Sequence, residues 1–433
     1  MSTEISYGLV LGGGGAKGSY QLGVWQALLE LQVSIKKILG VSIGSINGAL
    51  FATKTLTFAE QIWCAVDVEQ LFSLGASSDD SNSQNIILDF HSKLQKILNQ
   101  RGIDMDPLRQ LLADCISEDE LRKGKIAYAL LTCALPTFQP ITLSLDEIPI
   151  GKLFDYILAS SCFPAFQPQK IGKNTFVDGG LYDNVPIEQM AKSGLRQIIA
   201  VDLSTIGFHQ YYPMNEPDDL LIYIKTSFDL GSFFSNNPEQ VLLNKKAGYL
   251  DTKKAFNKLF GAVYFLDPVI RNDDFLLSAE SKLNFFGKIG ISTIKDWNSL
   301  LATILLKQIA INSDIRFGKQ AFLLALLEIT ALNLNISRYE VYDYNSFLAI
   351  INEEFNRILS SPEFFQLSEV LSNKPAKQIS KLLLSFSPRI LIAYIYHYLI
   401  DNPLQLQTVA RFFPQAALAA LTLHFINTKE SCF

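Results

Sequence analysis

Residues 9–26 read LVLGGGGAKGSYQLGVWQ, an apolar run that ends in four glycines and then resumes with apolar residues at helical spacing. The run from Ile5 to Leu11 predicts a short buried strand, which the glycines end. The apolar spacing after Ser19 predicts a helix that continues to about Leu31. A glycine turn between a strand and a helix can bind the phosphates of a dinucleotide or the oxyanion of a reaction. The two interpretations require different residues farther along the chain.

The segments that follow predict an α/β fold with a mainly parallel sheet. A second short strand is predicted at Ile38–Val41 and a helix at Ser45–Thr53. Further strand-like segments begin at Ile126 and Gln197. Strands that alternate with helices through tight connections are typical of a parallel sheet with crossover helices.

The character of the chain changes after about Asp267. Residues 319–334, KQAFLLALLEITALNL, and residues 388–400, PRILIAYIYHYLI, are typical of buried helices. We therefore predict an α/β domain that carries the functional motifs at residues 1–270. A mainly helical region of unknown role is predicted at residues 271–433.

The composition is that of a globular protein that does not bind nucleic acid. Apolar residues make up 48% of the 433 residues, and the formal net charge is −5, whereas nucleic-acid-binding domains normally carry a basic face. The five cysteines are dispersed, which predicts reduced thiols. The opening sequence MSTEISYGLVLGG has no basic stretch, and no segment offers the roughly 20 apolar residues of a bilayer span. We expect a cytoplasmic protein without a signal peptide or a transmembrane segment.

The second predicted strand separates the two interpretations of the glycine turn. Gly13 to Gly18 satisfies the pattern G-x-G-x-x-G, and a dinucleotide site would need an acidic residue about 20 residues farther on. No Asp or Glu occurs between Leu31 and Glu60. Residues 40–44 instead read GVSIG, the G-x-S-x-G pattern of a nucleophile elbow between a strand and a helix.

This pentapeptide makes Ser42 the candidate nucleophile. Gly40 and Gly44 flank it because side chains at these positions would collide with the strand or the helix. Lys17 adds positive charge in the upstream glycine turn. That turn then supplies the backbone amides of a candidate oxyanion hole, Gly13, Gly14 and Gly15.

A serine nucleophile needs a neighbouring base. The chain has four histidines, none of them in a motif, and His209 is the one candidate because it follows a strand and a glycine. The other candidate is Asp178, which ends the predicted strand NTFVD and precedes Gly179 and Gly180. Two glycines after an aspartate let another backbone or a substrate approach closely, and they are also typical of a simple turn.

Two further residues compete for a role in the site. Cys162 lies in the turn SSCFP, where a reactive thiol would need a base beside it. Ser19 begins the first predicted helix and is interpreted as its N-terminal cap.

Three blocks of sequence, in this order, resemble the patatin-like phospholipases. They are GGGGAKGSYQLGV at residues 12–24, GVSIGSINGA at 40–49 and VDGGLYDNVP at 177–186. A fourth block, ASSCFPAFQP at 159–168, resembles the family segment that precedes the aspartate strand. The resemblance covers about residues 5–205 and extends more weakly toward residue 270.

The resemblance implies a three-layer α/β/α patatin-like fold with a mainly parallel central sheet. It implies a dyad in which Ser42 is the nucleophile and Asp178 the general base, with the glycine loop as oxyanion hole and with no metal or cofactor. The activity that it implies is phospholipase A or lysophospholipase activity, which cleaves acyl esters of membrane phospholipids.

Two alternatives stay open on the sequence alone. One is a catalytically silent patatin fold that serves as a binding or scaffold protein, and the presence of both Ser42 and Asp178 argues against it. The other is an α/β-hydrolase esterase that depends on His209. The implied partners are a phospholipid or lysophospholipid substrate at a membrane surface, and a second copy of the chain or a protein activator. The apolar segment Phe412–Ile426 is a hypothesis for contact with lipid.

Overall fold

The computed structural model describes most of the chain in two units. The described residues are 5–66, 103–205, 208, 210, 218–235, 237–268, 279–314, 316, 321–366 and 386–428, so His209 lies outside them. The two compact units are Met1–Phe256 and Asn257–Phe433. The sequence analysis predicted the boundary between the two regions at residue 270, which also lies outside the described residues.

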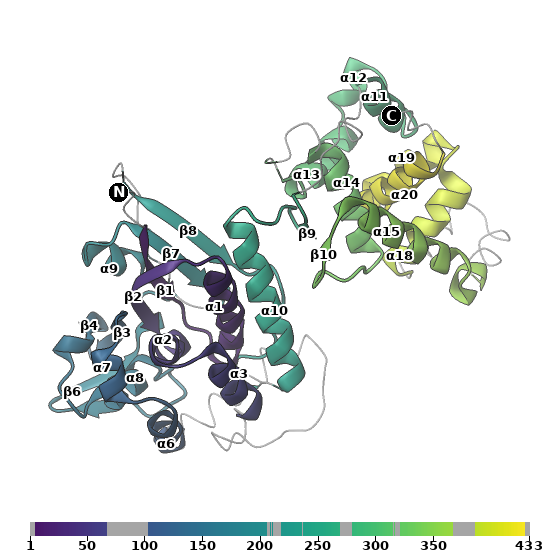
Figure 1. Ribbon diagram of the computed structural model, residues 1–433. Helices are drawn as coiled ribbons and strands as arrows, with labels where there is room; N and C mark the ends of the chain where they lie inside the picture. Colours follow the sequence, from purple (N-terminus) through teal and green to yellow (C-terminus); the bar gives the residue numbers. More distant parts are fainter. Residues whose placement is uncertain are drawn as a thin grey trace. The chain divides into compact units, whose positions relative to one another are not determined.

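A sheet of eight strands forms the centre of the first unit, and the prediction of a mainly parallel α/β fold is confirmed (Figure 1). Seven strands follow the order β5-β6-β3-β2-β1-β7-β8, and β4 also pairs with β3. The pairs from β3 to β8 along this order are parallel, whereas β4, β5 and β6 form antiparallel pairs at one end. The strands are β1 (Ser6–Leu11), β2 (Ser34–Val41), β3 (Ala127–Leu135), β4 (Gln139–Ser144), β5 (Gln169–Ile171), β6 (Asn174–Asp178), β7 (Gln197–Asp202) and β8 (Leu220–Lys225).

Helices cover both faces of this sheet, but not equally. Side chains alternate between the faces of a strand, so that Leu130 of β3 packs with the larger group of helices and Ala129 faces the other way. On that other face the described residues include one helix, α9 (Ile187–Lys192), which packs on Val10 and Leu39. The larger group consists of α1 (Tyr20–Glu30), α2 (Ile43–Thr53), α3 (Leu56–Ala65), α6 (Asp106–Cys115), α7 (Glu118–Lys123), α8 (Leu153–Ser160) and α10 (Pro238–Ala255).

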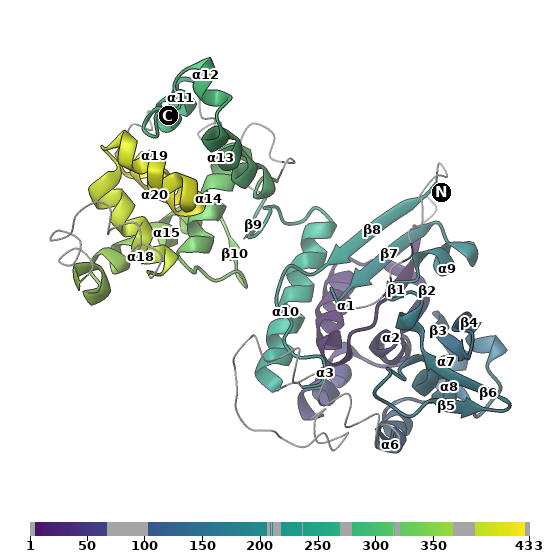
Figure 2. The same cartoon turned by 180° about the vertical axis from the view of Figure 1, so that it is seen from behind.

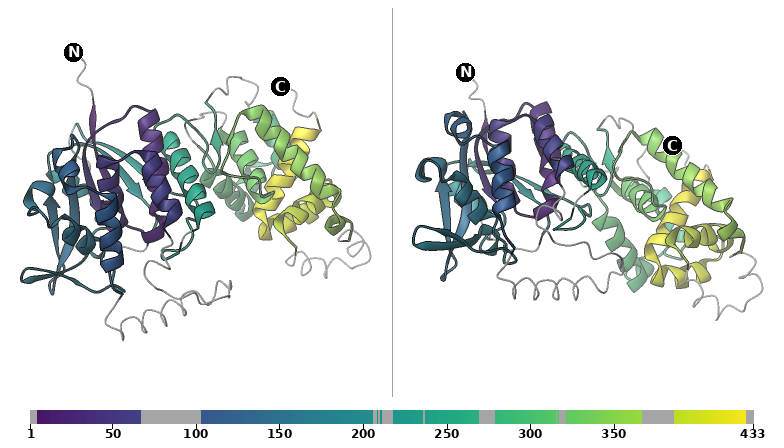
Figure 3. Two further views of the ribbon diagram at one scale, coloured as in Figure 1. Left: turned by 60° about the horizontal axis from the view of Figure 1, so that its bottom comes forward. Right: turned by 90° about the horizontal axis from the view of Figure 1, so that it is seen from below.

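Helix α1 is buried on most of its surface, and α10 packs along it. The two helices run side by side, in purple and teal in Figure 3. The Tyr20 hydroxyl of α1 donates a hydrogen bond of 2.8 Å to the Asp251 carboxylate of α10. The sequence predicted α1 but not α10, since the many polar residues of α10 hide its apolar face.

The second unit is mainly helical, as the sequence predicts, with one short pair of parallel strands (Figure 2). The strands are β9 (Phe265–Leu266) and β10 (Val341–Tyr342). The helices are α11 (Ala279–Gly287), α12 (Ile294–Trp297), α13 (Leu300–Ile311), α14 (Ala321–Asn333), α15 (Tyr344–Leu359), α18 (Pro388–Tyr394), α19 (Pro403–Phe412) and α20 (Pro414–Asn427), and a π-helix at Ile395–Leu399 continues α18. Within the described ranges, every helix is too short or too polar to cross a bilayer.

Helices α14 and α20 form the centre of this unit. Their side chains are buried along almost their whole length, as in Leu327 and Leu418, which are both fully inaccessible. The hypothesis that Phe412–Ile426 contacts lipid therefore fails for α20, because its apolar side chains are used in the core. Phe412, the last residue of α19, is the exposed exception at 71%.

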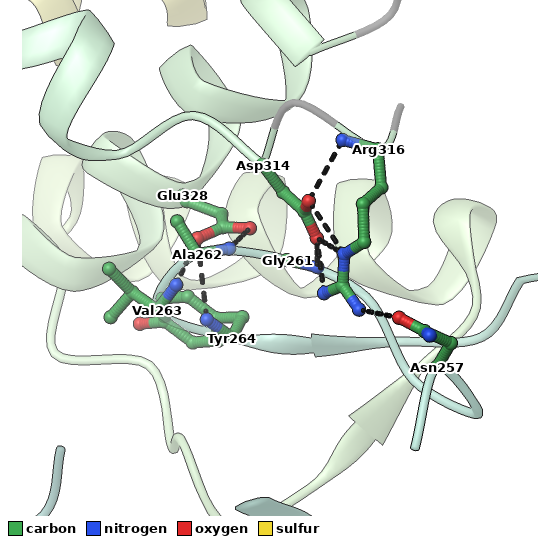
Figure 4. Close-up of polar contacts among 8 residues, drawn as sticks. All are labelled: Asn257, Gly261, Ala262, Val263, Tyr264, Asp314, Arg316 and Glu328. Atoms are coloured by element: carbon green, nitrogen blue, oxygen red, sulfur yellow. Dashed lines mark hydrogen bonds and ion pairs between the residues drawn. The ribbon is translucent and has the colours of Figure 1, made fainter. Parts of the chain in front are cut away.

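The first segment of the second unit is held by a buried carboxylate. Glu328 of α14 accepts hydrogen bonds from three consecutive backbone amides, those of Ala262, Val263 and Tyr264, at 3.0, 2.6 and 3.3 Å (Figure 4). Only 1% of the Glu328 surface is exposed. These amides belong to a turn and not to a helix or a sheet, so the carboxylate provides the acceptors that water would otherwise supply.

A second carboxylate fixes the residue before this turn. Asp314 accepts a hydrogen bond of 2.9 Å from the Gly261 amide and pairs with the Arg316 guanidinium (Figure 4). Arg316 also donates to the Asn257 side chain at 2.8 Å. Burial raises the pKa of Asp314, but the hydrogen bonds from Arg316 and Gly261 outweigh it and hold the pKa below its usual value.

Candidate active site

Ser42 and Asp178 meet at one point of the sheet although they are far apart in the sequence. Strand β4 pairs with one edge of β3 along residues 129–134, so the other partners of β3 share the opposite edge. On that edge, β2 is paired up to Leu131 and β6 is paired from Thr132 onward, in the antiparallel direction. The carboxyl ends of β2 and β6 therefore face each other. Ser42 directly follows β2 and Asp178 is the last residue of β6, so the pairing brings them together.

The backbone of Ser42 adopts a conformation that residues other than glycine rarely take. Its φ is 54° and its ψ is −128°, at the junction of β2 and α2. Such a conformation costs about 1–3 kcal/mol and persists only where the surroundings enforce it. A Cβ on Gly40 would collide with the backbone of Gly44, and a Cβ on Gly44 would collide with the carbonyl of Leu11. The local geometry is that of a nucleophile elbow.

Four hydrogen-bonding groups, two from Ser160 and two from Ser45, hold this strained turn. The Ser42 amide lies 3.2 Å from both the carbonyl and the hydroxyl oxygen of Ser160. The Ser160 hydroxyl in turn donates to the carbonyl of Leu131 at 2.8 Å. The amide and hydroxyl of Ser45 donate to the Ser42 carbonyl at 2.9 and 2.7 Å. Ser160 lies in the block ASSCFPAFQP, but the sequence assigned it no role.

Asp178 is a buried carboxylate with few hydrogen-bond donors. It is 3% exposed, and one carboxylate oxygen accepts a hydrogen bond of 2.8 Å from the Gly180 amide. Burial raises the pKa of Asp178 to about 6, and the hydrogen bonds from Gly180 and from the Ser42 side chain lower it only in part. A carboxylate with this pKa is well matched to accept a proton near neutral pH. The glycine that follows it, Gly179, has no side chain because the Leu131 backbone lies against it.

The glycine loop joins β1 to a short 3₁₀ helix, Gly15–Ser19, beside this junction. A Cβ on Gly13 would lie 3.0 Å from the Cβ of Ser42, so the loop passes directly over the serine. The Gly13 amide donates to the carbonyl of Asn184 at 3.4 Å. The amides of Gly14 and Gly15 donate no hydrogen bond to the part of the chain that the structure describes. These two amides are therefore the ones available to an oxyanion.

A third available amide was not found by the sequence analysis. Ile43 is the first residue of α2, and its amide has no acceptor within the helix. It also donates no bond elsewhere among the described residues. The amide that follows a nucleophilic serine, at the positive end of a helix dipole, is a common oxyanion donor. In the G-x-S-x-G pattern, the only signal for this amide is its position directly after the serine.

The other residues singled out in the glycine loop have structural surroundings. Lys17 lies in the 3₁₀ helix and makes no ion pair with the described residues. Gly18 packs against the side chain of Ile43, and its carbonyl accepts a hydrogen bond of 3.0 Å from Asn47. Ser19 stands at the N-cap position of α1, but its side chain makes no capping bond. The Ser19 hydroxyl accepts a hydrogen bond from Asn244 of α10 instead, at 3.0 Å.

Among the residues that the structure describes, the competing nucleophile and the histidines have no comparable arrangement. Cys162 is fully buried, its thiol lies 3.0 Å from the Gln167 carbonyl, and burial raises the pKa of the thiol to about 12. Such a thiol is a poor nucleophile. The described histidines, His397 and His424, both belong to the second unit. Within the described residues, no three His, Cys, Asp or Glu side chains come together as a metal site.

An apolar cavity opens beside Ser42. It runs along α2, from Ser42 past Ile43 and Ile46 to Leu50. Its walls come from three further parts of the first unit. These are α3 with Ile62, Trp63 and the following Val66, α6 with Leu108, Leu111, Leu112 and Cys115, and an aromatic group of Phe163, Phe166, Phe233 and Phe234. An apolar lining beside the polar group of Ser42 suits the hydrocarbon part of a ligand.

Comparison with known proteins shows that residues 9–191 match the family described as patatin-like phospholipase. Among curated relatives, the chain is 26% identical over 209 residues to mouse patatin-like phospholipase domain-containing protein 7, across 47% of this chain and 14% of that protein. It is 29% identical over 204 residues to lysophospholipase NTE1 of Mycosarcoma maydis, across 47% of this chain and 10% of that protein. The chain thus matches only a small part of the length of these relatives.

Among solved structures, the chain aligns with VipD from Legionella pneumophila. The alignment has 15% sequence identity and a TM-score of 0.34, and it covers 99% of this chain and 91% of that one.

Proposed function

Residues 9–191 form a patatin-like phospholipase domain, and from this premise we propose that the protein is a lipid acyl hydrolase of the phospholipase A or lysophospholipase type. In this proposal Ser42 is the nucleophile and Asp178 the general base. The observation that supports it most is the meeting of these two side chains at the junction of β2 and β6, beside unpaired amides and an apolar cavity.

The first half of the proposed reaction transfers the acyl group to the enzyme. The Asp178 carboxylate takes the proton of the Ser42 hydroxyl while the Ser42 oxygen attacks the ester carbonyl carbon. Negative charge then develops on the carbonyl oxygen, where the amides of Gly14, Gly15 and Ile43 are the proposed donors. The tetrahedral intermediate collapses, the ester C–O bond breaks, and protonated Asp178 gives its proton to the leaving alcohol oxygen.

The second half releases the fatty acid. Asp178, again ionised, takes a proton from a water molecule whose oxygen attacks the acyl carbon. The same amides stabilise the second oxyanion, and the bond between the acyl carbon and the Ser42 oxygen breaks as the serine regains its proton. The pKa of Asp178 near 6 supports both steps, because the group can accept and return a proton near neutral pH.

The cavity beside Ser42 supports a lipid as the substrate. Its lining is apolar apart from backbone, Ser42, Ser161 and the thiol of Cys115. Each methylene buried there contributes about 0.8 kcal/mol, which makes a long acyl chain the preferred occupant. Because Gly15, Ser42 and Ile43 line the same end of the cavity, the ester carbonyl of such a chain would lie beside the serine and the proposed oxyanion amides.

The test is release of fatty acid from mixed phospholipid and lysophospholipid vesicles. We expect Ser42→Ala and Asp178→Asn each to lower kcat by about 10⁴-fold or more, because both groups act in every step. His209→Ala is expected to retain activity. Asp155→Asn is the matched control, since this carboxylate of the same unit pairs with Arg109 and Lys152 instead.

The outcomes separate the alternatives. If His209→Ala is as inactive as Ser42→Ala, the base is a histidine and the proposed dyad is wrong. If the wild-type protein neither releases fatty acid nor reacts at Ser42 with a fluorophosphonate, the fold is a silent binding module.

A further inference from the structure

Asn184 lies between the two loops that carry the proposed catalytic groups. It is the third residue after the 3₁₀ turn Gly179–Leu181 and is 4% exposed. Its side chain and backbone bond to the glycine loop and to Thr205, which follows β7. The sequence block VDGGLYDNVP contains Asn184, yet no role was assigned to it.

Both polar groups of Gly13 are bonded through this residue. The Gly13 amide donates to the Asn184 carbonyl at 3.4 Å, and the Asn184 side-chain amide donates to the Gly13 carbonyl at 3.2 Å. The Thr205 hydroxyl donates to the same carbonyl at 2.9 Å. The Asn184 amide nitrogen also lies 3.1 Å from the Thr205 oxygen, which closes a ring of three hydrogen-bonded groups.

This ring fixes the direction of the next amide in the loop. The carbonyl of Gly13 and the N–H of Gly14 belong to one planar trans peptide, so they point in opposite directions. Two donors hold the Gly13 carbonyl on one side. The Gly14 N–H must therefore point to the other side, where it donates to none of the described residues.

The same side chain reaches the turn that follows Asp178. A Cβ on Gly13 would lie 2.6 Å from the Asn184 Oδ1 atom and 3.0 Å from the Cβ of Ser42. A Cβ on Gly180 would lie 2.8 Å from that oxygen and 3.2 Å from a carboxylate oxygen of Asp178. The Asn184 side chain thus fills the space between the two loops, and glycines at 13 and 180 leave it room.

We propose that Asn184, together with Thr205, is a positioning residue that aims the Gly14 N–H at the oxyanion and sets the spacing between the glycine loop and the Asp178 turn. This inference rests on the proposed function. The role predicts a specific kinetic defect: the ground-state substrate still binds through the apolar cavity, while the charge in the transition state loses its donor.

The experiment compares Asn184→Ala, Thr205→Val and the double variant in fatty acid release from phosphatidylcholine vesicles. We expect kcat to fall about 10²-fold for Asn184→Ala and about 10-fold for Thr205→Val, with KM within about twofold of wild type. The fold decrease in kcat of the double variant should be smaller than the product of the two single decreases, because both donors act on one carbonyl. Asn244→Ala is the matched control, a buried asparagine of α10 that bonds Ser19 and the Leu230 carbonyl, and its kcat should stay within about twofold.

A pH profile separates positioning from a general loss of structure. In the profile of kcat against pH, Asn184→Ala should leave the midpoint of the acidic limb at the wild-type value, because Asp178 keeps its Gly180 hydrogen bond. Asn184→Asp should move that limb to higher pH, since a second carboxylate then faces Asp178. If Asn184→Ala is unfolded, Thr205→Val alone decides the matter.

The inference is overturned if Thr205→Val and Asn184→Ala keep wild-type kcat, or if they raise KM without a loss of kcat. It is also overturned if Asn184→Asp leaves the pH limb in place. These outcomes count against Asn184 alone when the wild-type protein is active and Ser42→Ala is not. An inactive wild-type protein would refute the proposed function and this inference with it.

Discussion

Asp178 in the first unit and Glu328 in the second are both carboxylates removed from water, with 3% and 1% of their surfaces exposed. Glu328 accepts three backbone amide bonds, from Ala262, Val263 and Tyr264, and so its charge is well compensated (Figure 4). Asp178 accepts one amide bond, from Gly180, and the hydroxyl of Ser42 is its other partner.

The difference shows what burial does to a carboxylate when donors are few. Burial alone disfavours the ionised form, and each donated hydrogen bond favours it again. Asp178 keeps a raised pKa because its donors are too few, and one of them is the group from which it would take a proton. The three groups that bond Glu328 are backbone amides, and none of them is a hydroxyl that could give up a proton in a reaction. Glu328 therefore acts as a clamp for the turn at residues 261–264. Both carboxylates are buried, and the number and kind of their donors make one a candidate base and the other a structural element.

The largest effect on stability is expected at the clamp. Glu328→Ala leaves the buried amide of Tyr264 and the partly buried amides of Ala262 and Val263 without this acceptor, which should lower the free energy of unfolding of the second unit by about 3–5 kcal/mol. Hydrogen exchange followed by mass spectrometry would detect this as lost protection at residues 262–264 and in α14. Asp401→Asn is the control: among the described residues this exposed carboxylate pairs with Lys288 alone, and its replacement should change stability by less than about 1 kcal/mol. Unchanged protection at residues 262–264 in Glu328→Ala would contradict the comparison.

A smaller effect, of opposite sign, is expected at Asp178. Folding raises the pKa of Asp178 from 3.8 to about 6, so the folded state binds the proton more tightly than the unfolded state. The resulting stabilisation is fully present below about pH 4 and is lost as the pH rises through about 6. Asp178→Asn removes the buried charge and should therefore raise the free energy of unfolding at pH 8 by about 1–3 kcal/mol, with little change at pH 4. Urea unfolding of the full chain at both pH values measures this.

Asp155→Asn provides the matched comparison for that result. Burial raises the pKa of Asp155, but the hydrogen bonds from Lys152 and Arg109 outweigh it and lower the pKa. Its replacement should therefore decrease stability at pH 8, in contrast to Asp178→Asn. A decrease for both variants would show that Asp178 is as well compensated as Asp155 and that the account of its pKa is wrong.

Local chemistry explains which parts of the site could be predicted from the sequence. The elbow is a property of five consecutive residues, and the requirement for small residues at 40 and 44 is visible in GVSIG. The strand follows from an apolar run that the glycines end, and α1 follows from apolar residues at helical spacing. The predicted α/β fold with a mainly parallel sheet is confirmed for these reasons.

The rest of the site depends on pairing that no local pattern encodes. Ser42 and Asp178 meet because β2 and β6 share one edge of β3, a consequence of β4 holding the other edge. From the residues alone Asp178 and His209 both stayed open as the base, and the resemblance favoured Asp178. The roles proposed for the Ile43 amide and for Asn184 were missed, because a backbone amide has no residue identity and an asparagine in a loop is common. Ser19 stands at the N-cap position as predicted, but it makes no capping bond, because its hydroxyl bonds Asn244 of α10, a helix that the sequence did not predict.

The central claim is that a poorly compensated carboxylate, Asp178, activates Ser42. The most direct measurement is the rate at which a fluorophosphonate modifies the wild-type protein, Asp178→Asn and His209→Ala, from about pH 4 to about pH 9, with the modified peptide identified by mass spectrometry. The account predicts a single label on Ser42 and a rate that rises with a midpoint near pH 6, a dependence absent in Asp178→Asn and unchanged in His209→Ala. A label on another residue, a midpoint that persists in Asp178→Asn, or one that disappears in His209→Ala would contradict it.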